Sequence, residues 1–130
     1  MKKLYELAKE NIKNAYVPYS HFRVSAVLEL KNGETIKGIN VENASYGLSN
    51  CAERSALFAA YSQGVKKEDI KSILVLTDKD YFVSPCGACR QVMSELMEPN
   101  AKVYFANSKG EIKELLNKDL LPHGFTKEDL

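Results

Sequence analysis

The sequence predicts an α/β fold with a central, mixed, five-stranded sheet covered by helices. Helix-like and strand-like segments alternate along the chain, and residues 70–78 form a continuous apolar run typical of a strand buried on both faces. The chain has 130 residues, 45% hydrophobic and 27% charged. We expect one globular domain over residues 1–130, large enough to bury a core without disulfides.

The first half of the chain predicts a helix followed by a hairpin. Residues 3–15 have helical spacing of apolar positions, and Pro18 disfavours continuation of that helix. Residues 22–30 have the composition of a largely buried strand. The Asn32–Gly33 pair is a strong turn signal, so residues 35–41 are expected to return as an antiparallel strand.

The second half alternates helices with strands, after a polar loop at residues 42–50. Residues 51–64 are alanine-rich, with Gly64 at a C-cap position. The strand at 70–78 is followed by a helix over 86–97, a strand at 101–107, and a short strand or turn at 111–116. A strand–helix–strand unit favours a right-handed crossover, so parallel pairing is expected there.

Charge and hydropathy exclude several classes of partner. The net charge is +1, from 18 basic and 17 acidic residues, which disfavours duplex DNA or structured RNA as the main partner. The N-terminus lacks a signal-like apolar core, and no apolar run is long enough to span a bilayer. We therefore expect a cytoplasmic protein with no membrane partner, in which thiols stay reduced.

Three cysteines form the candidate metal site. Cys51 begins one predicted helix, and Cys86 and Cys89 begin another. Helix N-termini favour thiolates, and two such ends at one sheet edge can bring three thiolates together. Three protein ligands are typical of a catalytic zinc with an open position. His21 or His123 as a fourth ligand would instead close a structural site.

Glu53 favours catalysis over the alternatives. A carboxylate beside a zinc site can shuttle protons. Without the cysteine motif, Glu53 would be interpreted only as an acidic residue that stabilises the first turn of a helix. A thioredoxin-like dithiol made of Cys86 and Cys89 would employ neither Cys51 nor Glu53. The combination of "CAE" with "PCGAC" thirty-five positions later is the three-thiolate form of the zinc nucleobase-deaminase signature.

The chain resembles the small, homotetrameric cytidine deaminases in four blocks. These blocks are "PYSHFRVSAVL", "GINVENASYGLSNCAERSALF", "SPCGACRQVMSEL" and "LLPHGF", in the family's order over most of residues 18–125. The resemblance implies a three-layer α/β/α sandwich and one zinc ion per subunit. It also implies hydrolytic deamination of cytidine and deoxycytidine to uridine and deoxyuridine, with release of ammonia, in pyrimidine salvage.

The resemblance also implies roles for individual residues. Glu53 would pass protons between a water, N3 of the pyrimidine and the departing amine. Arg54 would hydrogen-bond the thiolates and offset their charge. The positions that contact the nucleoside are Asn40 and Glu42 for the ribose hydroxyls, Ala52 and Ser84 for the base edge, Phe22 for the base face, and Phe125 as a tail aromatic that caps a neighbouring subunit's site.

One position departs from the family, and two rival substrates remain. Ser25 stands where the family usually has glycine, in a strand expected near the pocket floor. A modified cytosine nucleoside such as blasticidin S is the alternative substrate, since its deaminases share the zinc motif, but "NVENASYG" favours an ordinary ribose. A base within a nucleic acid is disfavoured by the charge balance.

Overall fold

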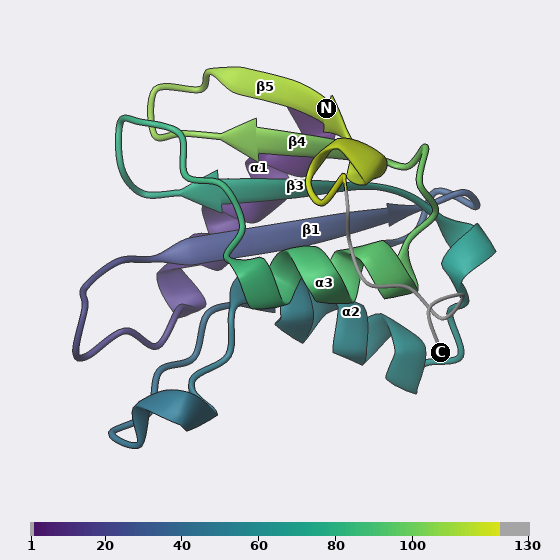
Figure 1. Cartoon of the computed structure of the whole chain (residues 1–130). Coiled ribbons are helices and arrows are strands. Elements are labelled where there is room, and N and C mark those ends of the chain that lie inside the picture. Colours follow the sequence, from purple (N-terminus) through teal and green to yellow (C-terminus); the bar gives the residue numbers. More distant parts are fainter. Residues whose placement is uncertain (1, 123–130) are drawn as a thin grey trace.

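The computed structural model describes residues 2–122 and confirms a three-layer α/β fold (Figure 1). The single mixed sheet has the strand order β2-β1-β3-β4-β5. The strands are β1 (Val24–Leu30), β2 (Thr35–Ile39), β3 (Ile70–Thr77), β4 (Lys102–Ala106) and β5 (Ile112–Leu116). The helices are α1 (Lys2–Asn11), α2 (Ala52–Ser62) and α3 (Gly87–Leu96).

The strand pairings follow the predicted connections. The β1–β2 hairpin is antiparallel and turns at Gly33, whose φ of 93° is in the left-handed region that glycine adopts without cost. The β3–α3–β4 unit gives the parallel pair, with Ser72 opposite Lys102. The segment at 111–116, expected as a strand or turn, is the antiparallel edge strand β5.

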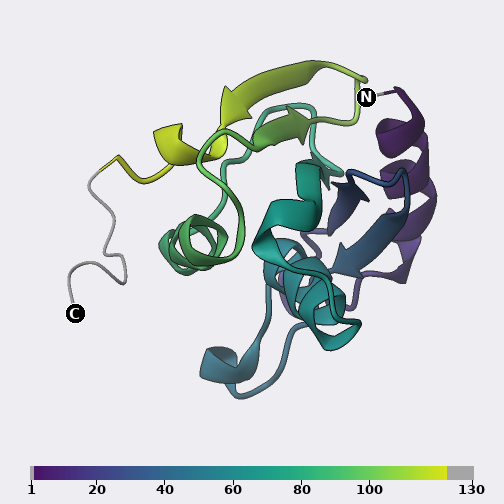
Figure 2. The same cartoon turned by 90° about the vertical axis from the view of Figure 1, so that its right-hand side faces the viewer.

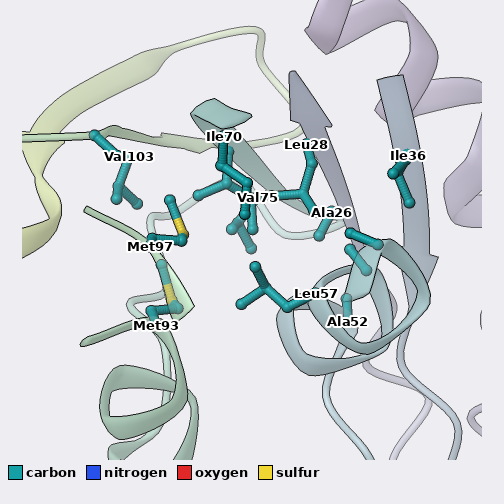
Figure 3. Close-up of a cluster of buried hydrophobic side chains, with 14 of the residues drawn as sticks. Ala26, Leu28, Ile36, Ala52, Leu57, Ile70, Val75, Met93, Met97 and Val103 are labelled. Carbon is teal, nitrogen blue, oxygen red and sulfur yellow. The ribbon is translucent and has the colours of Figure 1, made fainter. Parts of the chain in front are cut away.

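Each face of the sheet has its own core. Helix α1 covers one face, where Leu4 and Ala8 pack with Val27 and Leu74. Helices α2 and α3 lie side by side on the other face, as Figure 2 shows from the side. The larger core lies there, and Leu57, Met93 and Met97 point towards the sheet (Figure 3). All residues of β3 except Lys71 are buried, as predicted for a strand covered on both faces.

The ends of two elements differ from the predicted ranges. The helix expected over residues 3–15 is α-helical only to Asn11 and continues as a 3₁₀ turn at Ile12–Asn14. Tyr16 then donates its backbone N–H to the Asn40 carbonyl, so the chain leaves the helix to run beside the end of β2. The returning strand ends at Ile39, and Val41 forms only isolated bridges.

Ser25 lies in β1, the strand that borders the cavity through Val24, but its side chain is on the opposite face of the sheet. Side chains alternate along β1, and Ser25 shares with Val27 the face covered by α1. The Asn11 side chain donates to the Ser25 hydroxyl at 3.2 Å and to the Gly38 carbonyl at 3.2 Å. The serine therefore fastens the end of α1 to the sheet.

Gly38 sets the height of α2 above the sheet. A Cβ at this position would lie 2.4 Å from the Ala56 nitrogen and 2.5 Å from the Ala52 carbonyl oxygen. Only glycine allows the first turns of α2 to approach β2 this closely. Within residues 2–122, no helix combines the length and apolar character needed to cross a bilayer.

Candidate active site and metal centre

The three cysteines meet where α2 and α3 begin, beside the carboxyl end of β3. Cys51 is the N-cap of α2 and Cys86 is the N-cap of α3. The Sγ atoms of Cys51, Cys86 and Cys89 all lie within 4.8 Å of one another, and those of Cys51 and Cys86 are 3.6 Å apart. Tetrahedral thiolates with Zn–S of about 2.3 Å place sulfurs about 3.8 Å apart, so this set fits zinc.

The local backbone supports this arrangement. The Cys89 N–H donates to the Cys86 sulfur at 3.4 Å, so the Cys-x-x-Cys spacing satisfies a free donor in the first turn of α3. Cys89 is buried, whereas Cys51 is half-buried and Cys86 is exposed. Among the described residues, no histidine or carboxylate joins the three sulfurs in this cluster. His21 is excluded as a fourth ligand, and His123 lies outside the described residues.

Hydrogen bonds to Cys51 favour its thiolate. The Cys89 thiol and the Arg54 guanidinium both donate towards its sulfur, and they lower the pKa of Cys51 to about 5 against the opposing effect of burial. The same pairing, with burial, raises the pKa of Cys89. Arg54 Nη2 lies 3.5 Å from the Cys51 sulfur. Arg54 thus contacts Cys51, one of the three thiols that the resemblance assigns to it.

The Glu53 carboxyl group is shielded from bulk solvent and lies next to the thiols. It lies in the first turn of α2 and is only 4% exposed. Burial raises the pKa of Glu53 to about 7, and the nearby Cys51 charge adds to this effect, whereas its own backbone N–H and Arg54 oppose it. A carboxyl group with a pKa near neutrality can both accept and return a proton at physiological pH.

A small cavity of about 180 Å³ is lined by Glu53 together with Cys51 and Cys86. Ala52 and Ser84, the two positions that the resemblance assigns to the base edge, line it, and the mostly apolar wall includes Val24 and Val75. The cavity is also lined by Asn40. Asn40, Cys51 and Cys86 also line an adjoining cavity of about 720 Å³, which contains Glu42 and Arg54.

Asn40 lines both cavities, whereas Glu42 lines only the larger one, and both residues are half-buried. The Asn40 side chain accepts from the Val24 N–H at 2.9 Å and donates to the Phe22 carbonyl at 2.8 Å, which fixes its orientation. Phe22 is half-buried, with Lys79 Nζ 5.5 Å from the ring centroid. Phe125 lies outside the described residues.

Arg90 is a structural element of the site that the sequence reasoning missed. Its guanidinium donates to the Pro85 carbonyl at 2.8 Å, to the Leu120 carbonyl at 2.7 Å and to the Ser84 hydroxyl at 2.7 Å. It thereby holds the segment before Cys86 against the C-terminal part of the described chain. Its position directly after Cys89 was the available signal, but the acceptors are set by tertiary structure.

The fold and the site together define a zinc-dependent nucleobase deaminase. Residues 1–106 match the family described as "Cytidine and deoxycytidylate deaminase zinc-binding region". The chain is 54% identical over 127 residues to a cytidine deaminase from Halalkalibacterium halodurans, covering 95% of each sequence. The chain belongs to the cytidine deaminase family.

Solved structures agree with this assignment. The crystal structure of cytidine deaminase from Burkholderia pseudomallei superposes with a TM-score of 0.92 at 45% identity, covering 95% of this chain and 98% of that one. The cytidine deaminase from Mycobacterium tuberculosis gives a TM-score of 0.80 at 32% identity, with 95% of each chain covered. The predicted α/β/α sandwich is thus confirmed at the level of the whole fold.

Proposed function

We propose that this protein hydrolyses cytidine and deoxycytidine to uridine and deoxyuridine with release of ammonia, as a step of pyrimidine salvage. The observation that carries the proposal is the cavity that brings buried Glu53 together with Cys51 and Cys86. A structural zinc site has no need of such a cavity. A dithiol oxidoreductase has no use for a third thiol and a buried carboxyl.

The three thiolates would hold one zinc ion per subunit, which supplies an activated water at neutral pH. Glu53 then acts as the proton carrier. It carries both protons of the water in turn: the first goes to N3 of the pyrimidine as oxygen adds at C4, and the second, taken from the new hydroxyl group at C4, goes to the amine as its bond to C4 breaks. Burial keeps this carboxyl out of bulk water, so that its protons pass to the substrate.

The shape of the two cavities suits a nucleoside. The smaller one is bounded by Ala52, Ser84 and apolar side chains and would take the pyrimidine. Phe22, which the resemblance assigns to the base face, lines neither cavity. Asn40 and Glu42 in the larger one would bind the ribose hydroxyls. A site that hydrogen-bonds the sugar discriminates against a bare base or a substrate lacking ribose. This feature favours ordinary nucleosides over blasticidin S.

Arg54 would correct the charge of the metal centre. Three thiolates and one zinc(II) carry a net charge of about −1, which disfavours ionisation of water. A guanidinium that donates to Cys51 withdraws part of that charge.

The assembly we propose is a cytoplasmic homotetramer of single-domain subunits, each spanning residues 1–130. The loop at 42–50 projects from the body of the molecule (Figures 1 and 2) and exposes Tyr46 (90%) and Leu48 (72%), which suits burial against another subunit. Phe125 of a neighbour would cap the site. A verified monomer with full activity would contradict this part of the proposal.

Glu53→Gln tests the proton carrier directly. The variant keeps the size of the side chain but cannot accept a proton, so turnover of cytidine should fall at least about 100-fold while zinc content stays the same. Full turnover by zinc-loaded Glu53→Gln protein would refute the mechanism. Turnover of blasticidin S but not of cytidine by the unmodified protein would favour the alternative substrate.

A further inference from the structure

A short loop, residues 16–22, holds the Glu42 carboxylate in place. Residues 16–22 run beside the end of β2: Tyr16 N–H donates to the Asn40 carbonyl at 3.0 Å, and Glu42 N–H donates to the Tyr16 carbonyl at 2.9 Å. This backbone pairing places the following turn next to the Glu42 side chain. His21 completes the turn with a φ of 58°, in the left-handed region, and its N–H donates to the Val17 carbonyl at 3.0 Å.

Three donors of this turn converge on the carboxylate. Glu42 Oε1 accepts from the backbone N–H groups of Tyr19 and Ser20, each at 3.1 Å. Glu42 Oε2 accepts from the Ser20 hydroxyl. The same Ser20 oxygen accepts from the Phe22 N–H at 3.0 Å. Ser20 therefore links the carboxylate expected at the ribose to the backbone of the aromatic expected at the base.

Counting acceptor positions shows what remains for a ligand. An ionised carboxylate offers about four lone-pair positions, two on each oxygen. The two backbone donors occupy Oε1, and the Ser20 hydroxyl occupies one position of Oε2. One acceptor position on Oε2 is left, and Glu42 lines the same cavity as Cys51 and Cys86. These hydrogen bonds also keep the carboxylate charged, since they lower the pKa of Glu42.

We propose that Ser20 is a positioning residue for substrate: its hydroxyl orients Glu42 so that a single acceptor position on Oε2 faces a sugar hydroxyl, and it ties that acceptor to Phe22. The inference rests on the proposed nucleoside deaminase function. It assigns Ser20 to sugar recognition and not to the proton transfers at Glu53.

Steady-state kinetics of zinc-loaded Ser20→Ala protein with cytidine tests the proposal. Loss of the hydroxyl leaves Oε2 without its donor while the two backbone N–H groups still hold Oε1, so the carboxylate can pivot about Oε1. KM should therefore rise about tenfold while kcat changes less than about twofold. Ser20→Thr, which retains a hydroxyl, should restore most of the KM. Ser62→Ala, at an exposed serine at the far end of α2, is the matched control and should leave both constants unchanged.

A double-mutant cycle with Glu42→Ala distinguishes positioning from a general effect on folding. If Ser20 acts through the carboxylate, Ser20→Ala should raise KM no further in the Glu42→Ala protein. Three results would each overturn the inference while leaving the deaminase assignment intact. They are an unchanged KM for Ser20→Ala, a fall in kcat as large as the rise in KM, or additive effects of the two substitutions in the cycle. Absence of cytidine turnover by the unmodified zinc-loaded protein would overturn the proposed function and this inference with it.

Discussion

Gly38→Ala should damage both stability and catalysis, because the added methyl group meets backbone that cannot rotate away. Its Cβ would lie 2.4 Å from the Ala56 nitrogen, whereas ordinary contacts begin at 3.4 Å, so α2 must move by about 1 Å. Overpacking of a close contact costs about 1–3 kcal/mol of stability. Because the added Cβ would have three backbone contacts under 3.0 Å, we expect a loss of about 3 kcal/mol. With a urea dependence of about 2 kcal/mol per molar, the unfolding midpoint should fall by about 1.5 M.

The same displacement reaches the active site, since Cys51 and Glu53 lie at the start of α2. A shift of about 1 Å in reacting groups can cost about 100-fold in rate, and we expect a loss of that order in kcat/KM. Urea unfolding at one fixed protein concentration, with zinc in excess, measures the stability change. Ser62→Ala, at an exposed position at the far end of α2, is the stability control. A Gly38→Ala protein within about 0.5 kcal/mol of the unmodified one would refute the close-approach argument.

Three further predictions follow from the electrostatics and hydrogen bonds of the site. In zinc-free protein, Arg54→Gln should raise the pKa of Cys51 above about 5, as measured by thiolate absorbance. In zinc-loaded protein, the same substitution should lower kcat about 10- to 100-fold. An unchanged pKa of the Cys51 thiol would show that Arg54 does not stabilise the thiolate. In zinc-free protein the pKa of Glu53 is raised from 4.5 to about 7. The free energy of unfolding should therefore be highest below pH 4.5, where the carboxyl is neutral in both states, and should decline as the pH rises from 4.5 through 7. Glu53→Gln should abolish that decline in urea titrations at several pH values, and an identical decline in both proteins would contradict the raised pKa. The lysine of Arg90→Lys protein cannot supply donors to the three separate acceptors of Arg90. The free energy of unfolding, measured by urea titration, should therefore fall by about 2 kcal/mol. A fall below about 0.5 kcal/mol would show that these hydrogen bonds contribute little.

Local signals were sufficient to predict the sheet and the cluster of three cysteines. The Asn32–Gly33 turn sets the hairpin, and the uninterrupted apolar run of β3 marks a strand covered on both faces. Cys51 and Cys86 could be placed at helix starts because the helical pattern begins immediately after each of them. Two helices that begin at the same edge of a sheet must bring their first turns close together, which is why the thiol cluster was predictable.

Tertiary contacts decided what the sequence could not show. Alternation along β1 separates Ser25 from Val24, but it does not say which face is covered by α1 and which borders the cavity. The acceptors of Arg90 lie up to 30 positions away along the chain. Glu42 is likewise held by Ser20, 22 positions earlier, through a turn that requires an unusual conformation at His21. Such contacts depend on the exact path of loops, for which periodicity gives no information.

The measurement that tests the central claim most directly is zinc content per chain in freshly purified protein, with conversion of cytidine to uridine followed by ultraviolet absorbance in the same sample. The structure predicts one zinc per chain, lost together with turnover in Cys86→Ala protein, because two thiols cannot complete the site. Protein without zinc that forms a reversible disulfide between Cys86 and Cys89 would contradict the account and indicate redox chemistry instead.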